Sequence, residues 1–325
     1  MAELDARSME KALSGRRSAV ADFIKRLTRE KTMGTVGGVI VLLFLFVGIF
    51  ANFLAPYGYN ETNMLAVLVA PSGKVILGTD QLGRDLLSRI IYGARISMYV
   101  GVGASALDAG LATIIGIVSG YFGGKFDLVI QRFVDAVIVF PNLFFYLSVM
   151  ALLGPGLVQV IFCLGVLNGI GSSRLIRSAV MATRNNVYID AIRSIGSSNP
   201  RILFRHILPN VLAPIIIIFT ISMGGVIIAE ASLSFLGMGI PPPTPSWGGM
   251  LSGAGRQYMM KAPWLVIWPG LALSLVVYGI NMFGDALRDL LDPRLRGGVG
   301  GLGEYGAMKA MKAREKKQKK TKITE

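Results

Sequence analysis

The stretch GGVIVLLFLFVGIF, residues 37–50, decides the fold class because it is an unbroken apolar run. It lies inside a longer segment, Met33 to Leu54, that contains no charged residue. A helix needs about 20 apolar residues to cross a hydrocarbon core of about 30 Å. The segment therefore predicts a transmembrane helix, and it is too long for the apolar core of a cleaved secretory signal.

Further runs of this kind follow along the chain. With 53% hydrophobic and 16% charged residues and a mean hydropathy of +0.58, the composition excludes an ordinary soluble enzyme. We predict an all-α integral membrane protein with six spans in one bundle. It divides into an N-terminal arm (1–32), a membrane domain (33–296) and a basic tail (297–325). The later spans are expected at Ile96–Tyr121, Phe133–Leu153, Leu157–Ser172 with a continuation toward Ile176, Val211–Phe235 and Trp264–Gly284.

Basic residues indicate how the chain is oriented. Most of the 33 Lys and Arg residues fall before residue 33, in the segments that follow the second and fourth spans, and after residue 284. Because Lys and Arg are retained on the cytoplasmic side, both termini are predicted to be cytoplasmic, and the loops 55–95 and 237–263 to face outward. The formal net charge of +14 then reflects contact with membrane lipid, and no nucleic-acid partner is expected.

Residues for catalysis or metal binding are scarce. The sequence has no phosphate-binding loop of the GxxxxGK[ST] type, so any ATP must be hydrolysed by another polypeptide. The one histidine, His206, has no second histidine or cysteine nearby, and the one cysteine, Cys163, lies inside a predicted span. We predict no catalytic site, no metal site and no cofactor in this chain.

The most informative polar stretch is NNVYIDAIRSIGSSNPRILFRHILPN, residues 185–210. Val187, Ala191 and Ile195 recur with helical spacing, and Asp190 can pair with Arg193 one turn later. Gly196 suits the end of that helix, and a second helix is expected to run from Pro200 and to end at Pro209. A compact helix-turn-helix unit of this kind can carry force from a partner into the following span.

This stretch resembles the signature loop of ABC importer permeases. In that family Glu-Ala-Ala, three residues, Gly, nine residues and Ile-x-Leu-Pro dock into a cleft of the ATP-binding subunit. This chain departs from the pattern at Asp190 (for Glu), at Ile192 (for the second Ala) and at His206 (for Ile). The resemblance assigns contact with the ATPase to Asp190, Ala191, Ile192, Gly196, Leu208 and Pro209 within the coupling loop 185–209.

Four other motifs resemble the dipeptide and oligopeptide branch of the same permeases, and specifically the second of its two permease subunits. The similarity extends from about residue 33 to 297. The motifs are LGTDQLGRDLLSRIIYGARIS (77–97), GYFGGKFDLVIQRFVDAVIVFPN (120–142), AEASLSFLGMGIPPPTPSWGGML (229–251) and GDALRDLLDPRLRG (284–297).

The resemblance implies a set of partners and a mechanism. The partners are two ATP-binding subunits that hold ATP and Mg, a homologous second permease and an extracytoplasmic solute-binding protein, at the cell inner membrane. The mechanism is alternating access, in which ATP binding switches the bundle between its two openings. In the outward loops, Asp80, Arg84, Asp85 and Trp247 are candidates for docking of the solute-binding protein, with a membrane-surface strut as the alternative.

Carboxyl groups within spans are costly and suggest function. Glu230 belongs to the matched motif and is a candidate for lining or gating the passage, with a helix-to-helix hydrogen bond as the alternative. Asp108 matches no motif, so its role stays open. GxxxG pairs at Gly116/Gly120 and Gly165/Gly169 predict close contact between helices.

The alternative function is an ATP-independent secondary carrier or channel. It predicts inverted repeats and several charges at mid-membrane, and neither is evident in the sequence. The sequence leaves the solute open among dipeptides, oligopeptides, nickel and oligosaccharides, and it does not identify the partner permease.

Overall fold

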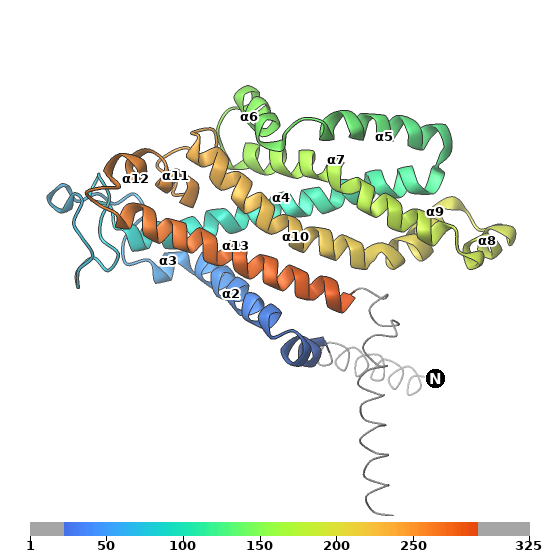
Figure 1. Cartoon of the computed structure of the whole chain (residues 1–325), viewed down its shortest axis with the longest axis horizontal. Coiled ribbons are helices and arrows are strands. Elements are labelled where there is room, and N and C mark those ends of the chain that lie inside the picture. The colour runs from blue at the N-terminus through green and yellow to red at the C-terminus, as the bar shows by residue number, and fades with distance from the viewer. Residues whose placement is uncertain (1–22, 292–325) are drawn as a thin grey trace, which may run out of the picture.

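The computed structural model describes residues 23–291, which form a bundle of long helices (Figure 1). Five of these helices are long and apolar enough to cross a membrane. This arrangement confirms the predicted all-α membrane fold, although helices extend further than the apolar runs alone indicated. The five long helices are α2 (Thr32–Ile49), α4 (Leu86–Phe122), α7 (Leu157–Arg184), α10 (Leu208–Phe235) and α13 (Trp264–Leu291).

The predicted third span is not one straight helix. In the structure α5 (Gly124–Ile138) and α6 (Asn142–Leu153) meet at 91°, and the described residues reach six spans only if this bent pair counts as one. Pro141 explains the break, because proline lacks an N–H and disfavours helical geometry in the residue before it. Figure 1 shows α5 lying along α7, with α6 turned away from that direction.

The short elements gather at the two opposite ends of the bundle (Figure 1). One end, called here the α8 end, carries α8 (Val187–Ser194), α9 (Asn199–Ile202) and the π-helix η2 (Leu203–Ile207). The other, called the α12 end, carries α3 (Ala51–Leu54), η1 (Met64–Ala66), α11 (Trp247–Leu251) and α12 (Gly253–Tyr258). Of the predicted N-terminal arm only residues 23–32 are described, and the tail 297–325 lies outside the described residues.

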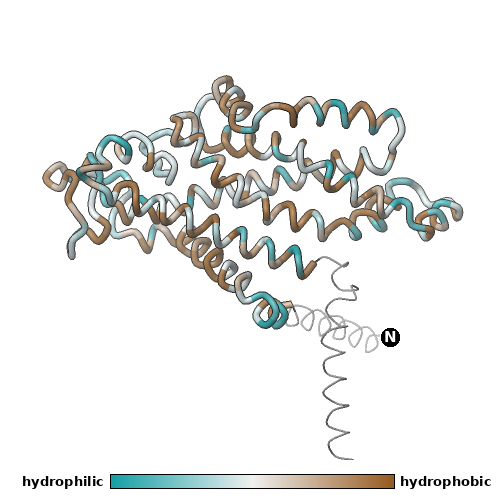
Figure 2. The backbone as a smooth tube through the Cα atoms, in the orientation of Figure 1, coloured by the Kyte–Doolittle hydropathy of each residue, from teal (hydrophilic) through white to brown (hydrophobic). Residues whose placement is uncertain are grey.

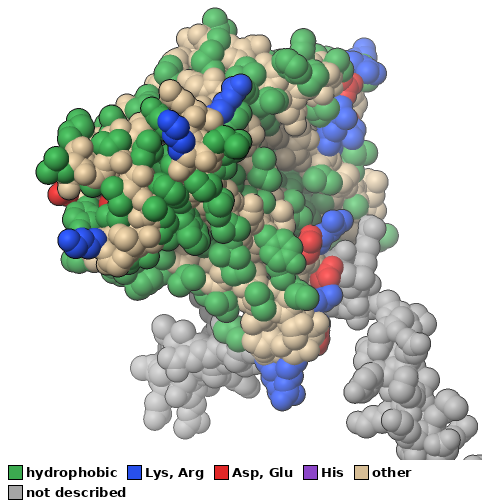
Figure 3. Space-filling view, turned by 60° about the vertical axis from the view of Figure 1, so that its left-hand side comes forward, with side chains coloured by type: hydrophobic (Ala, Val, Ile, Leu, Met, Phe, Trp, Pro, Cys, Tyr) green, Lys and Arg blue, Asp and Glu red, His purple; other side chains and the backbone are tan. Residues whose placement is uncertain are grey.

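Apolar side chains cover much of the outside of the bundle. Figure 2 shows apolar residues along the long helices and hydrophilic residues around α8 and in the segment just before α2. On α2, Val39, Leu42 and Leu43 are more than half exposed. The face in Figure 3 is likewise mostly apolar, with scattered basic side chains. Such a surface is unfavourable in water and suits contact with lipid.

Glycines bring α4 and α7 into close contact, as the GxxxG pairs predict. A Cβ atom added at Gly116 would lie 2.7 Å from Cβ of Ile176 and 2.8 Å from the carbonyl oxygen of Ser173. One added at Gly169 would lie 3.0 Å from the carbonyl oxygen of Asp108. Real Cβ atoms do not fit at such distances, so the two backbones pack together only because glycine stands at these positions.

Alanine at Gly116 should therefore destabilise the bundle. Overpacking of this kind typically costs about 1–3 kcal/mol, and we expect the melting temperature of the purified chain to fall. Gly110→Ala is the matched control on the same helix, because a Cβ there meets no atom within 4 Å. Equal melting temperatures for the two variants would contradict the proposed role of the glycine contact.

Candidate functional site

The α8 end presents an apolar helix face that nothing in the described chain covers. The Val187 and Ile195 side chains are 84% and 83% exposed, and Ala191 between them is exposed as well. These three residues recur with helical spacing in the sequence. Asp190 lies beside this face and forms the predicted pair with Arg193, at 3.4 Å between Oδ1 and Nη1.

Ile192, the last residue of the triplet, and Gly196 are differently placed. Ile192 is half-buried, whereas Gly196 is exposed and adopts a φ of +82°, a left-handed conformation that favours glycine. A Cβ added at Gly196 would meet no atom of this chain within 4 Å. Space beside Gly196 is therefore open to a partner.

The opposite face of α8 anchors the unit to the bundle. Ile189, Ile202 and Ile207 are fully buried in a cluster with Ile176 and Val180 of α7. At the end of α4, Tyr121 donates a hydrogen bond from Oη to Oδ1 of Asn199 at 2.7 Å. The Arg193 guanidinium lies 5.8 Å from the centre of the Tyr121 ring. Sequence reasoning gave Tyr121 no role, because only the fold brings residues 121 and 199 together.

Pro209 does not end the second helix, contrary to the sequence-based expectation. The chain runs from α9 through the π-turn η2 into α10 as one helical segment, Asn199–Phe235. Leu208 and Pro209 occupy the first turn of α10. The wider π-turn precedes the proline, and the segment continues through it. The α8 end is thereby continuous with a membrane helix.

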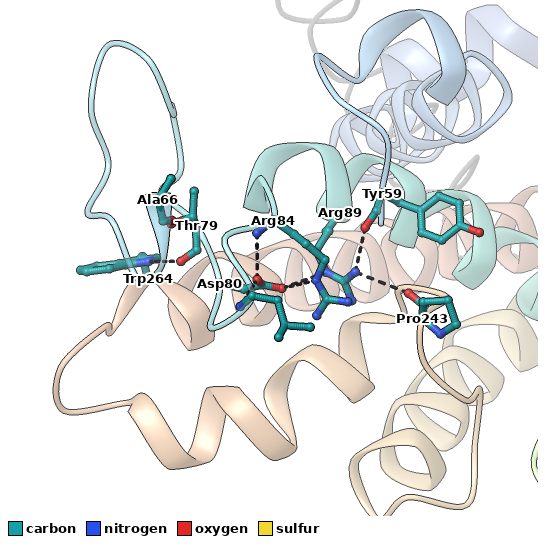
Figure 4. Close-up of polar contacts among 9 residues, drawn as sticks. Tyr59, Ala66, Thr79, Asp80, Arg84, Arg89, Pro243 and Trp264 are labelled. Atoms are coloured by element: carbon teal, nitrogen blue, oxygen red, sulfur yellow. Dashed lines mark hydrogen bonds and ion pairs between the residues drawn. The ribbon is translucent and has the colours of Figure 1, made fainter. Parts of the chain in front are cut away.

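At the α12 end, a buried ion-pair network joins distant segments (Figure 4). The Asp80 carboxylate accepts a bond from Arg84 Nε at 2.7 Å and faces Arg89 Nε at 3.7 Å. Arg89 also donates to the backbone oxygens of Tyr59 at 2.9 Å and Pro243 at 3.4 Å. One arginine therefore ties the segment before α4 to the segment that follows α10.

The other two candidates at this end are also structural. Asp85 caps α4 by accepting from the backbone N of Ser88 at 2.7 Å, so the helical pair that Asp85 and Arg89 could form by spacing is absent. Trp247 Nε1 donates to the carbonyl of Ile90 at 3.2 Å, and its side chain is fully buried.

The four residues predicted to dock the solute-binding protein are all engaged within the chain. Asp80, Arg84, Asp85 and Trp247 are all buried, because each serves a contact within the chain. They support the surface without forming it. The exposed apolar side chains at this end are others, among them Leu65 (97% exposed) and Met260 (90%).

Glu230 is fully buried near the end of α10. Its Oε1 accepts a hydrogen bond from Ser234 Oγ at 2.7 Å, and the same hydroxyl accepts from the backbone N of Ile240 at 3.1 Å. The carboxyl thus braces the turn that follows α10. This contact is of the kind given as the alternative to gating, although it stays within one helix and its turn.

A cavity of about 1260 Å³ opens along α6, α7 and α10. Its walls are mainly apolar, with Ile217, Ile221 and Val226 from α10 and Leu143 from α6. Polar side chains also reach it, namely Asp108, Tyr146, Asn168, Ser172 and Ser222. Gly225 lines it too, and a Cβ added there would meet nothing within 4 Å. The cavity is large enough for a small peptide.

Comparison with known proteins finds two matching family models. Residues 112–297 match the model of the binding-protein-dependent transport system inner membrane component. Residues 18–71 match the N-terminal transmembrane domain of oligopeptide transport permease C.

Curated relatives are similar over most of both chains. A dipeptide transport system permease protein of Alkalihalophilus pseudofirmus is 41% identical over 272 residues, covering 84% of this chain and 89% of the relative. A di/tripeptide transport system permease protein of Pseudomonas aeruginosa is 38% identical over 286 residues, covering 86% and 93%. A glutathione transport system permease protein of Escherichia coli is 39% identical over 282 residues, covering 85% and 91%.

Removing the Asp80 charge should loosen the α12 end. In Asp80→Asn, the buried Arg84 and Arg89 lose their carboxylate, and breaking a buried pair in this way costs about 3–5 kcal/mol. We expect a lower melting temperature and faster proteolysis within residues 55–85. Arg132→Gln is the control, because its pair with Asp135 is exposed and such pairs contribute less than about 1 kcal/mol. Equal effects of the two substitutions would refute the bracing role.

Proposed function

This chain belongs to the family of binding-protein-dependent transport system inner membrane components and is a membrane permease subunit of an ABC importer, and on that premise we propose that it carries dipeptides or oligopeptides. In this family the ATPase is a separate subunit. The functions of the relatives, which include dipeptide and di/tripeptide transport, support peptides as the solute.

We further propose the assembly and its orientation. The chain pairs with a homologous second permease, two ATP-binding subunits that hold ATP and Mg, and one extracytoplasmic binding protein, in the cell inner membrane. The α8 end and both termini face the cytoplasm, and the α12 end faces outward. The concentration of Lys and Arg in the segments assigned to the cytoplasm supports this orientation.

The observation that carries the proposal is the exposed α8 face on a rigidly anchored helix. Val187, Ala191 and Ile195 offer an apolar contact, with Asp190 and Gly196 at its border. An ATPase that binds this face would move α8 together with the buried cluster around Ile189. The motion would reach α4 through Tyr121, and it would reach α10 through the continuous helical segment 199–235. The motion is then transmitted within the coupling loop by Ile192, Leu208 and Pro209.

The cavity supplies the passage in this proposal. It reaches Asp108 within α4 and also Arg288 and Leu291 near the end of α13, so it extends toward the α8 end. Alternating access would move solute from the outward side into this cavity and then release it. The binding protein would dock on the exposed rim of the α12 end, where Leu65 and Met260 lie, while Asp80, Arg84, Asp85 and Trp247 hold that rim in shape.

Leucine at Gly196 should uncouple the importer. It fills the open space at the proposed contact, and we expect at least about tenfold less ATPase subunit to co-purify with the permease, with loss of uptake. Gly237→Leu is the matched control, because Gly237 has a φ of +83°, also meets no atom within 4 Å, and lies at the opposite end of α10. Normal ATPase recovery with Gly196→Leu would refute the coupling role.

Leucine at Gly225 should block the passage without affecting assembly. Its side chain would extend into the cavity, so peptide uptake should be abolished while ATPase recovery stays normal. Gly110→Leu, on the exposed face of α4, is the control and should transport normally. Full uptake by Gly225→Leu would exclude this cavity as the route. Uptake into liposomes that contain the permeases alone would favour the secondary carrier.

A further inference from the structure

Asp108 is a carboxyl group that lies deep in the membrane domain and has no ion-pair partner among the described residues. It lies well inside α4, its side chain is fully buried, and neither Oδ atom has a hydrogen bond of standard geometry. Its backbone packs against Gly169 of α7, which fixes its position relative to that helix. An ionisable group at such a depth is costly, and its retention needs a compensating role.

No positive charge neutralises Asp108 within the described part of the chain. None of the ion pairs between residues 23 and 291 includes it. Asp108 nevertheless lines the cavity, where the other charged residue of the lining is Arg288, close to the end of α13. The cavity therefore has one carboxyl group deep in its wall and one guanidinium group toward the α8 end.

Polar side chains from three other helices surround this carboxyl group. Ser172 of α7 and Ser222 of α10 lie beside it. Tyr146 of α6 donates its hydroxyl to Oδ1 of Asn168, one turn before Ser172, at 2.7 Å. The hydroxyl groups of Ser172 and Ser222 can accept hydrogen bonds, while much of the remaining wall is Ile, Leu, Val and Ala. The arrangement is a small polar site in an apolar cavity.

We propose that Asp108, Ser172 and Ser222 form a binding site for the N-terminal ammonium group of a peptide in the cavity. This inference rests on the proposed peptide transport. An α-ammonium group is the cation that peptides share at neutral pH, and it has three N–H donors for a carboxylate and two hydroxyl oxygens. Without such acceptors, a peptide moving along the apolar wall of the cavity would have its ammonium group desolvated and unpaired.

The composition of the site also suits brief binding of a peptide during transport. Conduction requires binding that is strong enough for entry and weak enough for release. A single carboxylate helped by neutral hydroxyl groups meets that need better than a cage of several charges. The same site would disfavour a peptide whose amino group is acetylated, because the cation is then missing and the carboxylate stays unpaired.

The test measures equilibrium binding of trialanine and N-acetyl-trialanine to the complete transporter complex in nanodiscs, without the binding protein. Omitting that protein removes its own peptide preference from the result. We expect the wild-type complex to prefer the free amino group by about tenfold, the contribution of one charge-assisted hydrogen bond. Asp108→Asn should bind both peptides equally, and Asp108→Glu should restore part of the preference.

Glu230→Gln is the matched control, because it removes a second buried carboxyl group that does not line the cavity. It should retain the preference of the wild type. The inference is overturned if the wild-type complex binds both peptides equally or binds neither, and also if a folded Asp108→Asn complex keeps the preference. If Asp108→Asn fails to assemble, the relative binding of the two peptides to the wild-type complex still tests the inference.

Uptake of labelled trialanine by the wild-type transporter with its binding protein is measured in parallel. Failure of that uptake would count against peptide transport itself. Normal uptake with no preference for the amino group would instead leave the transport function intact and refute only the ammonium site.

Discussion

The close packing of α4 against α7 is the contact on which the rest of the structure depends. Apolar side chains alone cannot hold two helices together in lipid, since the lipid chains are equally apolar. Glycines at positions 116, 120, 165 and 169 solve this problem by letting backbones approach until dispersion contacts are dense. Helices α4 and α7 together then form one rigid wall of the bundle. The cavity lies along it, and Asp108 is positioned by its contact with Gly169.

The two ends of the bundle are built by different physical means. At the α12 end, buried ion pairs and backbone contacts of Arg89 join segments that are far apart in the sequence, and such a network resists deformation. At the α8 end, an apolar cluster and side-chain hydrogen bonds, such as the one from Tyr121, attach a short unit that is continuous with α10. The first arrangement suits a rigid rim, and the second suits an element that moves as a body together with its helix.

The sequence alone was sufficient to predict the features that depend on local composition. Long apolar runs located the spans, and the spacing of Asp190, Gly196 and Pro209 located the α8 unit. It failed where one residue changes the path of the chain, as at Pro141, where a predicted span bends by 91°. It also failed for pairs set by the fold. The i, i+4 spacing of Asp85 and Arg89 would allow an ion pair, but in the structure Asp80 faces both Arg84 and Arg89, and Asp85 caps a helix. The contact of Tyr121 with Asn199 has no signal in either local sequence.

The buried carboxyl groups of Glu230 and Asp108 show why burial by itself does not identify a functional residue. The matched motif drew attention to Glu230, yet Ser234 and the backbone of Ile240 give it a local structural task at the end of α10. Asp108 belongs to no recognised motif, but it faces a cavity, with hydroxyl groups near it and no cation paired to it within the described residues. The two groups differ in position, because Asp108 lines the cavity and Glu230 does not, so only Asp108 is placed to meet a solute. Asp108 is therefore the stronger candidate for contact with a passing solute.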